Sequence, residues 1–290
     1  MKKILSIMIV LLFVIAMLPV NVFADVGDVI PNNESGIPDK NLYQAILYRA
    51  DYNNDKVLTR DEAEWLTELD AESCGIKKLK GIENLYNLIV LDVSDNRLTS
   101  LKGVEKLANL ECLHIYNNNL TSIKGLDKLT KLEYFDVSGN KLTVIPDIGK
   151  LTKLKCFDVS GNKLTAIPGL GKLTKLTYLD ASKNKLTAIS GLGNLSKLEE
   201  IYLSKNKLTV IPVLDKLTRL YHLDVSANQL TSLKGIEKLT NLFELLAGEN
   251  KLKTLPNMKK LTELFSLRAE FYWNYIPASE FYKNSPKHHK

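Results

Sequence analysis

Apolar residues recur along most of this chain with a fixed step of 22 residues. In the stretch LECLHIYNNNL they follow the template L-x-x-L-x-L-x-x-N-x-L, with Asn118 at the polar place. The template returns at every step, and the nine residues FDVSGNKLT occur twice, at 135–143 and at 157–165. One such unit is too small to bury its own leucines, so the pattern predicts repeats that stack against one another.

Asparagine occupies the same place in eight consecutive units. It follows a short strand, such as the one through Leu113 and Ile115, where the chain turns sharply and leaves backbone groups away from water. Because an asparagine side chain carries both a donor and an acceptor, a stack of them satisfies those groups. One step earlier the place is held by Cys74, which we therefore expect to be buried. The eight residues are Asn96, Asn118, Asn140, Asn162, Asn184, Asn206, Asn228 and Asn250.

This template is typical of a leucine-rich repeat and predicts an α/β solenoid, a horseshoe with a parallel β-sheet on its concave face. Strand centres at the repeat step run from Leu69 to Leu267, which predicts ten strands. A unit of 22 residues leaves little room for a full helix opposite the strand. Four prolines therefore indicate extended or 3₁₀ segments on the convex side. They are Pro146, Pro168, Pro212 and Pro256.

The ends of the chain depart from the template. Residues 39–66 contain two short helical patterns, DKNLYQAILYRA and TRDEAEWL, and we expect a helical N-terminal cap there. The solenoid follows over 67–270, and the aromatic-rich tail at 271–290 is expected to close it. Residues 25–38 are a linker before the cap.

Residues 1–24 have the features of a secretory signal peptide. Lys2 and Lys3 precede a short apolar run, and Val22 and Ala24 place small side chains before the expected cleavage site. An uncleaved membrane anchor is the alternative. Since no second stretch is apolar enough to span a bilayer, we predict a secreted, extracellular protein, at most loosely associated with the cell surface. Loss of the two lysines lowers the formal charge from +6 to +4.

The arrangement over about 39–282 resembles the internalin family of bacterial surface proteins, and LTELDAESCGIKKLKGIENLYNLIVLDVSDNRLTSL carries the resemblance most clearly. The resemblance implies an EF-hand-like helical cap, a curved solenoid, and recognition of a protein ligand by the concave face. Adhesion or another host interaction is the corresponding role.

Outward strand positions that differ between repeats are the candidate contacts for such a ligand. One column carries exposed aromatic side chains, which suit an interface, and the next is an acidic stripe. A cationic or mixed-charge protein ligand fits both, whereas the alternative is a solvated polar face without a partner. The candidate ligand-binding residues are Tyr116, Tyr134, Asp136, Asp158, Tyr178, Asp180, Glu200, Tyr202, His222 and Asp224.

Two histidines lie in these columns between pairs of carboxylates, which favour the protonated imidazole. The pattern suggests a charge change under mild acid, while one histidine with two carboxylates is a sparse ligand set for zinc. Cys112 and His114 project from the same face, but no third group is apparent in the sequence to complete a nucleophile. Cys112 and Cys156 lie two strands apart, beyond disulfide reach, so we expect free thiols.

The segment DYNNDKVLTRDE has the spacing of an EF-hand calcium loop. Position six is Lys56, where glycine normally allows the sharp turn, and Thr59 with Glu62 also forms a capping-box pattern for the next helix. Calcium in the N-terminal cap and a structural loop without metal both remain open. The candidate ligands are Asp51, Asn53, Asp55, the Val57 carbonyl, Thr59 and Glu62.

No catalytic or nucleotide-binding motif is present, so we expect no enzyme and, apart from calcium, no cofactor. The acidic stripe and modest charge argue against nucleic-acid binding. The prediction is a monomeric secreted binding module for a protein ligand. The alternative is a wall-associated structural protein, held by basic rims to anionic cell-wall polymers.

Overall fold

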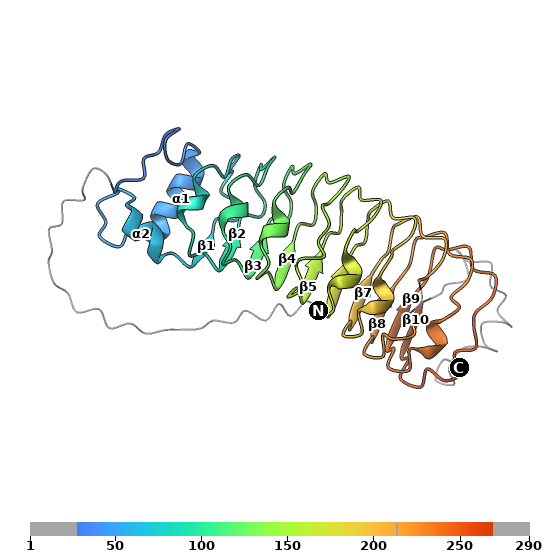
Figure 1. Ribbon diagram of the computed structural model, residues 1–290. Coiled ribbons are helices and arrows are strands. Elements are labelled where there is room, and N and C mark those ends of the chain that lie inside the picture. Colours follow the sequence, from blue (N-terminus) through green and yellow to red (C-terminus); the bar gives the residue numbers. More distant parts are fainter. Residues whose placement is uncertain (1–27, 213, 269–290) are drawn as a thin grey trace.

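The computed structural model describes residues 28–212 and 214–268, which form one elongated solenoid (Figure 1). Its sheet contains ten parallel strands in chain order, and each strand pairs with its neighbour at a register of 22 residues. The predicted fold and strand positions are confirmed, whereas the predicted signal peptide and closing cap lie outside the described residues. The strands are β1 (Glu68–Asp70), β2 (Val90–Asp92), β3 (Cys112–His114), β4 (Tyr134–Asp136), β5 (Cys156–Asp158), β6 (Tyr178–Asp180), β7 (Glu200–Tyr202), β8 (His222–Asp224), β9 (Glu244–Leu246) and β10 (Ser266–Arg268).

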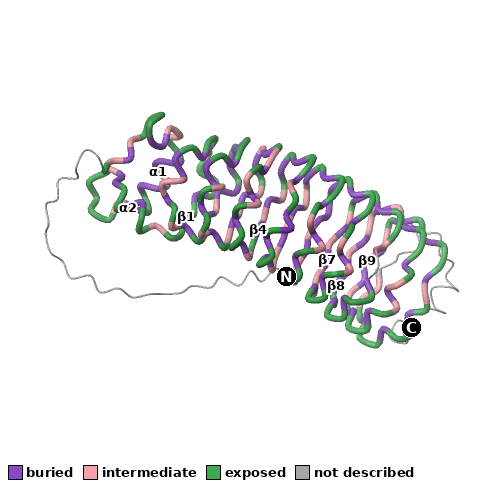
Figure 2. The backbone as a smooth tube through the Cα atoms, viewed as in Figure 1, coloured by how far each residue is buried: buried purple, intermediate pink, exposed green. Residues whose placement is uncertain are grey.

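The core runs the full length of the solenoid and is filled mainly by leucine. In β1 to β9 the central residue is buried and, except at His222, its two neighbours are more exposed, as Cys112 and His114 are on either side of Leu113. Buried and exposed positions therefore alternate along every coil (Figure 2). The part of the chain that the structure describes contains no helix long and apolar enough to cross a membrane.

Each ladder asparagine joins its own repeat to the one before. Asn140 Nδ2 donates to the carbonyls of Val137 and Ser138 in its own turn, at 3.1 Å each, and to that of Ile115 at 3.0 Å. Its Oδ1 accepts a hydrogen bond of 3.0 Å from the Leu120 amide. All eight asparagines are buried and repeat this arrangement, so the predicted ladder is confirmed. The amides bond to the preceding backbone and not to one another.

The convex side contains short 3₁₀ helices, and their positions follow the glycines. Each of the six begins directly after a glycine with positive φ, such as Gly125 (φ 87°) before Leu126–Lys128. Where Asp147 or Asn257 replaces that glycine, the described chain has no 3₁₀ helix. The left-handed conformation is favourable for glycine and strained for most other residues, which explains the difference. The six helices are Ile82–Asn84, Val104–Lys106, Leu126–Lys128, Leu170–Lys172, Leu192–Asn194 and Ile236–Lys238.

Two helices cover the β1 end of the solenoid, α1 (Lys40–Ala50) and α2 (Arg60–Trp65) (Figure 1). Asp39 connects them to the first repeat. Its Oδ1 accepts hydrogen bonds from the first turn of α1, and its Oδ2 accepts from the amides of Lys77 and Lys78 at 2.8 and 3.0 Å. One carboxylate thus caps the helix and fixes the cap to the solenoid.

Candidate functional site

The outward-facing residues of the ten strands form one continuous surface, which we call the exposed sheet face. Strand pairing places Tyr134 beside Cys112 and Cys156, and Asp158 beside Asp136 and Asp180. Nine of the ten predicted contact residues lie on the strands of this face, and Tyr116 lies just past β3. The geometry therefore assembles the predicted columns as the repeat step required.

The aspartates of the acidic column also have a structural role. Each aspartate accepts a hydrogen bond from the backbone amide of the serine two residues later, as Asp158 does from Ser160 at 2.8 Å. The interaction caps the end of the strand. Asp92, Asp136, Asp180 and Asp224 bond in the same way to the serines that follow them. The recurrence of Asp-x-Ser in the repeats is the signal for it.

Burial and mutual repulsion set the charge of the acidic column. Burial, together with the nearby carboxylates of Asp136 and Asp180, raises the pKa of Asp158 to about 7. Burial likewise raises the pKa of Asp180. The column therefore carries less negative charge near neutral pH than its composition suggests.

Aromatic rings gather on β6, β7 and β8, and we call Tyr178, Tyr202 and His222 the aromatic cluster. The rings of Tyr178 and Tyr202 lie 5.6 Å apart between centroids, and those of Tyr202 and His222 lie 4.5 Å apart. Tyr202 donates a hydrogen bond of 2.7 Å to Glu200, which also accepts one from Tyr221. Carboxylates and aromatic faces thus occupy the same patch.

His222 supports this cluster from below. Its side chain is buried, with Nδ1 3.0 Å from Glu244 Oε2, and Nε2 is buried without a hydrogen-bond partner within the described residues. Its ring packs beneath Tyr202, so it orients that tyrosine and offers little surface of its own to a ligand.

A row of exposed aromatic side chains borders the aromatic cluster, one residue ahead of three successive strands. Tyr221, Phe243 and Phe265 are 41%, 49% and 73% exposed, and the two phenylalanine rings stack at 5.3 Å between centroids. The row was not predicted, because candidate contacts were sought within and just after the strands and not directly before them. Its signal was the same 22-residue step.

Near β2 and β3, the exposed sheet face carries a tyrosine, a histidine and a cysteine that contact carboxylates or one another. Tyr116 donates a hydrogen bond to Glu72, which raises the pKa of the phenol. Nearby, Nδ1 of His114 lies 3.5 Å from Asp92, and Nε2 lies 3.3 Å from the Cys112 sulfur. Hydrogen bonds to Asp92 and Cys112 raise the pKa of His114 to about 10. The predicted stabilisation of its protonated form is confirmed, and its charge does not change under mild acid.

The predicted burial of Cys74 is wrong. Its side chain is exposed, and its sulfur contacts only the Glu72 carbonyl, at 3.3 Å, among the hydrogen bonds of the described chain. Cys74 lies in the first repeat, where α1 and α2 replace the preceding coil that would have covered it. All three cysteines are free, as expected.

The polar side chains of the candidate calcium loop form hydrogen bonds within the loop. Asp51 accepts from the amides of Asp55 and Lys56 at 3.1 Å each, and Asp55 accepts from the Val57 amide at 2.8 Å. The side-chain amide of Asn53 also donates to Asp55, at 3.0 Å. Within the described residues, no group of three or more histidine, cysteine or acidic side chains is placed to hold a metal ion.

Glu62 takes the capping role that competed with calcium. It accepts hydrogen bonds of 2.9 Å from the Thr59 amide and hydroxyl, and its own amide donates to Thr59. The capping box before α2 is complete. Glu62 Oε1 is buried without a hydrogen-bond partner in the described chain. Calcium binding stays a prediction from the spacing of the loop residues.

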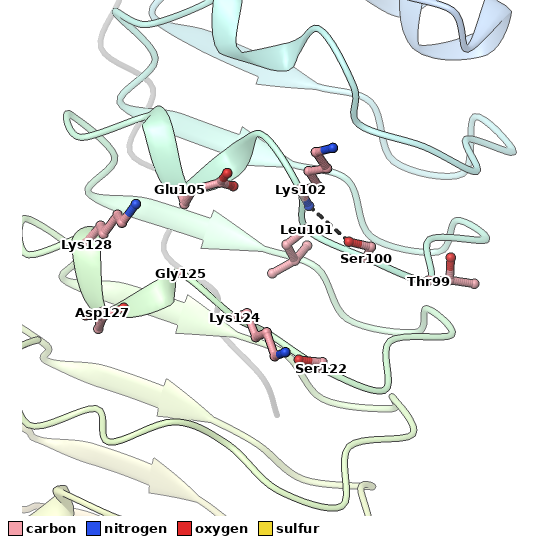
Figure 3. Close-up of a pocket in the computed structure, with 10 residues that line it drawn as sticks. All are labelled: Thr99, Ser100, Leu101, Lys102, Glu105, Ser122, Lys124, Gly125, Asp127 and Lys128. Carbon is pink, nitrogen blue, oxygen red and sulfur yellow. Dashed lines mark hydrogen bonds between the residues drawn. The ribbon is translucent and has the colours of Figure 1, made fainter.

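A shallow hollow of about 630 Å³ lies between two repeats, away from the strands (Figure 3). Its lining mixes charges of both signs, with Lys102, Lys124 and Lys128 near Glu105 and Asp127. The Lys150 ammonium holds the pKa of the Asp127 carboxyl below its ordinary value. The hollow presents no convergent set of polar groups and supports no specific chemistry.

Comparisons with known proteins agree with this architecture. The family model described as "Leucine Rich repeats (2 copies)" matches residues 108–151, 130–172, 152–194 and 196–238. No curated protein sequence matches significantly. Fold and matches together define a leucine-rich repeat protein.

Comparison with solved structures shows which leucine-rich repeat proteins the chain is similar to. Internalin C2 from Listeria monocytogenes is 27% identical, with 77% of this chain and 99% of that chain covered and a TM-score of 0.68. The functional domain of InlJ from the same species, which includes a cysteine ladder, is also 27% identical, with 78% and 54% covered and a TM-score of 0.64. YopM from Yersinia enterocolitica is 30% identical, with 70% and 41% covered and a TM-score of 0.60. The chain is an internalin-like leucine-rich repeat protein.

Proposed function

We propose that the chain is a secreted binding module that recognises a protein ligand through the exposed sheet face, on the concave side of the solenoid. The first 24 residues support export, and the internalin-like architecture supports a binding role, with adhesion or another host interaction as its setting. The ligand contacts the varied strand positions, while the ladder and the leucines form an unchanging scaffold.

The aromatic cluster carries this proposal. Tyr178 and Tyr202 present ring faces beside the Glu200 carboxylate, and the exposed Tyr221 adds a third ring at the edge. Ring faces and carboxylates together attract cations, and tyrosines often dominate the energy of protein interfaces. A lysine or arginine side chain of the ligand fits this patch.

The test is to compare wild-type chain with two double variants in affinity capture. Immobilised residues 25–290 are used to capture partners, which are identified by mass spectrometry. Tyr134→Ala with Tyr178→Ala, and Tyr178→Ala with Tyr202→Ala, each weaken the identified complex by at least about tenfold. Tyr86→Ala, at an exposed tyrosine outside the face, is the matched control. Equal affinity of all variants would remove the sheet face from the proposed function.

The alternative function rests on the lysines of the repeats. Two rows of exposed lysines, one before the strands and one after the ladder, recur over four consecutive units. Regularly spaced cations of this kind suit an anionic polymer of the cell wall. The rows are Lys131, Lys153, Lys175 and Lys197, and Lys141, Lys163, Lys185 and Lys207.

Salt separates the two functions. Binding to a wall polymer through exposed lysines weakens steeply as ionic strength rises, because the charges are screened. Salt-sensitive retention on purified cell walls, unaffected by the tyrosine variants, supports the alternative. Retention at high salt with loss in the tyrosine variants supports the protein ligand.

A further inference from the structure

Cys112, His114 and Asp92 form a connected group on β2 and β3, which we call the thiol site. The Cys112 sulfur lies 3.3 Å from His114 Nε2, and His114 Nδ1 lies 3.5 Å from Asp92 Oδ2. Strand pairing places Asp92 directly beside His114, although the two are 22 residues apart in sequence. The sequence placed carboxylates on both sides of His114, and in the structure Asp92 is the one that contacts its ring.

The surrounding structure fixes the orientation of this group. The Ser94 amide donates a hydrogen bond of 2.9 Å to Asp92 Oδ1, which leaves Oδ2 to the imidazole. Burial raises the pKa of Asp92, but the hydrogen bonds from His114 and Ser94 outweigh that effect and lower it. Asp136 stands beside His114 on the opposite strand and adds a second negative charge. The ring is therefore held with Nε2 toward the sulfur.

The other two cysteines lack such a partner. The Cys74 sulfur contacts a backbone carbonyl, and partial desolvation together with the nearby Asp70 carboxylate raises the pKa of its thiol. Burial also raises the pKa of Cys156. Within the described chain, Cys112 is thus the one cysteine with an imidazole in contact, although Cys74 is more exposed. Thiol reactivity follows thiolate formation, for which a neighbouring imidazole is effective.

We propose that Cys112 is a nucleophilic thiol that forms a mixed disulfide with small aliphatic disulfides, with the protonated His114 ring as the hydrogen-bond donor that stabilises its thiolate and Asp92 as the positioning residue. This site is independent of the proposed ligand contacts around the aromatic cluster.

The exchange is balanced in atoms and electrons. Cys112 releases its proton to solvent, and the resulting thiolate, which accepts a hydrogen bond from the protonated His114 ring, attacks one sulfur of the disulfide R–S–S–R. A new bond joins Cys112 to that sulfur, while the old S–S bond breaks and its electron pair leaves with the second sulfur. The departing thiolate takes up a proton from solvent and leaves as R–SH. The small disulfide is the oxidant, and one equivalent is consumed for each chain.

The mixed disulfide has no internal thiol to resolve it among the described cysteines. Cys156 is on β5, two strands from β3, a separation of about 10 Å that exceeds disulfide reach. The adduct therefore stays on the exposed sheet face beside Tyr134.

The test measures the reaction of single-cysteine chains with cystine and with an aromatic disulfide reagent. Cys74→Ser with Cys156→Ser leaves Cys112, and Cys112→Ser with Cys156→Ser leaves Cys74. We expect Cys112 to react at least about tenfold faster than Cys74 near pH 7, although accessibility alone predicts the reverse order. Intact-mass measurement should show one added half-disulfide.

Variants of the two partners test their roles. In the Cys112-only chain, His114→Gln or Asp92→Asn removes most of the rate advantage and makes the pH profile between about pH 6 and pH 8 as steep as that of Cys74. Asp147→Asn, the same change at an aspartate that also accepts a hydrogen bond from the amide two residues later but lies outside the sheet face, is the matched control and leaves rate and profile unchanged. Circular dichroism establishes that each variant is folded. A Cys112 rate no higher than that of Cys74, or a rate unaffected by His114→Gln, would overturn the proposal.

Discussion

Phe135 and Phe157 stack inside the solenoid with their ring centroids 5.7 Å apart and their planes at 12°. They are the first residues of the two identical stretches FDVSGNKLT, and they lie side by side because β4 pairs with β5. Both rings are buried, whereas most other units carry a smaller aliphatic residue at this place. The repeated sequence thus places two stacked phenylalanine rings in the core.

Removing one of these rings should destabilise the middle of the solenoid. We expect Phe157→Ala to lower the free energy of unfolding by about 3–5 kcal/mol, through lost burial and the cavity left behind. Urea unfolding followed by circular dichroism measures the change. Val144→Ala, at a side chain that is 67% exposed, should change it by less than about 0.5 kcal/mol. Equal effects of the two variants would contradict this account of the core.

The ladder gives a second prediction, at Asn140. Alanine there leaves the Leu120 amide and the carbonyls bonded to Nδ2 unsatisfied. Since each buried unsatisfied group costs about 1–3 kcal/mol, we expect a loss of at least about 2 kcal/mol in urea unfolding. Asn119→Ala, at the partly buried neighbouring position, is the control and should cost far less. A small loss at Asn140 would mean that water satisfies these groups.

Asp158 gives a prediction for pH. It keeps its proton up to about pH 7 in the folded chain, whereas an unfolded aspartate releases it near pH 4. Since the folded state binds more protons over that interval, its contribution makes stability fall as pH rises from about 4 to about 7. Asp158→Asn keeps the oxygen that bonds to Ser160 and removes the titration.

The expected result is that Asp158→Asn gains stability relative to wild type at pH 8 and not at pH 5. Chemical unfolding at both values measures it, and Glu263→Gln, at an exposed carboxylate, is the control. An Asp158→Asn chain with the wild-type pH dependence would show that its carboxylate titrates normally.

The capping box gives a prediction for the N-terminal cap. Thr59→Ala removes the hydroxyl that accepts from the Glu62 amide and donates to its carboxylate, so we expect a loss of about 0.5–2 kcal/mol. Thr59→Ser retains the hydroxyl and should behave like wild type. Thermal unfolding of all three chains, with and without millimolar calcium, also tests the loop. A calcium-dependent rise in melting temperature would show that the folded chain binds calcium.

Periodicity made most of the fold predictable from the sequence. The positions of Asn140 and Phe157 followed from the 22-residue step, because each unit meets the same neighbours. The 22-residue step predicted wrongly that Cys74 is buried. At this position the helical cap replaces a repeat and leaves the side chain exposed. The repeat template therefore describes residues that lie between two repeats and not residues at an end of the solenoid.

The candidate site was predictable in its members but not in their interactions. The repeat columns correctly predicted that Tyr202 and Asp158 lie on one surface. They did not predict the ring contact between His222 and Tyr202 or the hydrogen bond between Asp158 and Ser160, because both depend on side-chain rotamers. The columns also placed Asp92 beside His114, but they did not show that Asp92 and Cys112 contact different nitrogens of the same ring. Side-chain orientation across strands is information that a repeat count does not contain.

Pairing strictly between consecutive strands has a consequence for length. Excision of residues 135–156 would bring Tyr134 next to Phe157 and restore an uninterrupted repeat, so the molecule should shorten by one coil and still fold. Duplication of the same segment should lengthen it without disturbing either end. An ancestral gene could thus change the reach of its product by copying or losing one module, while the chemistry on every remaining coil stayed in place.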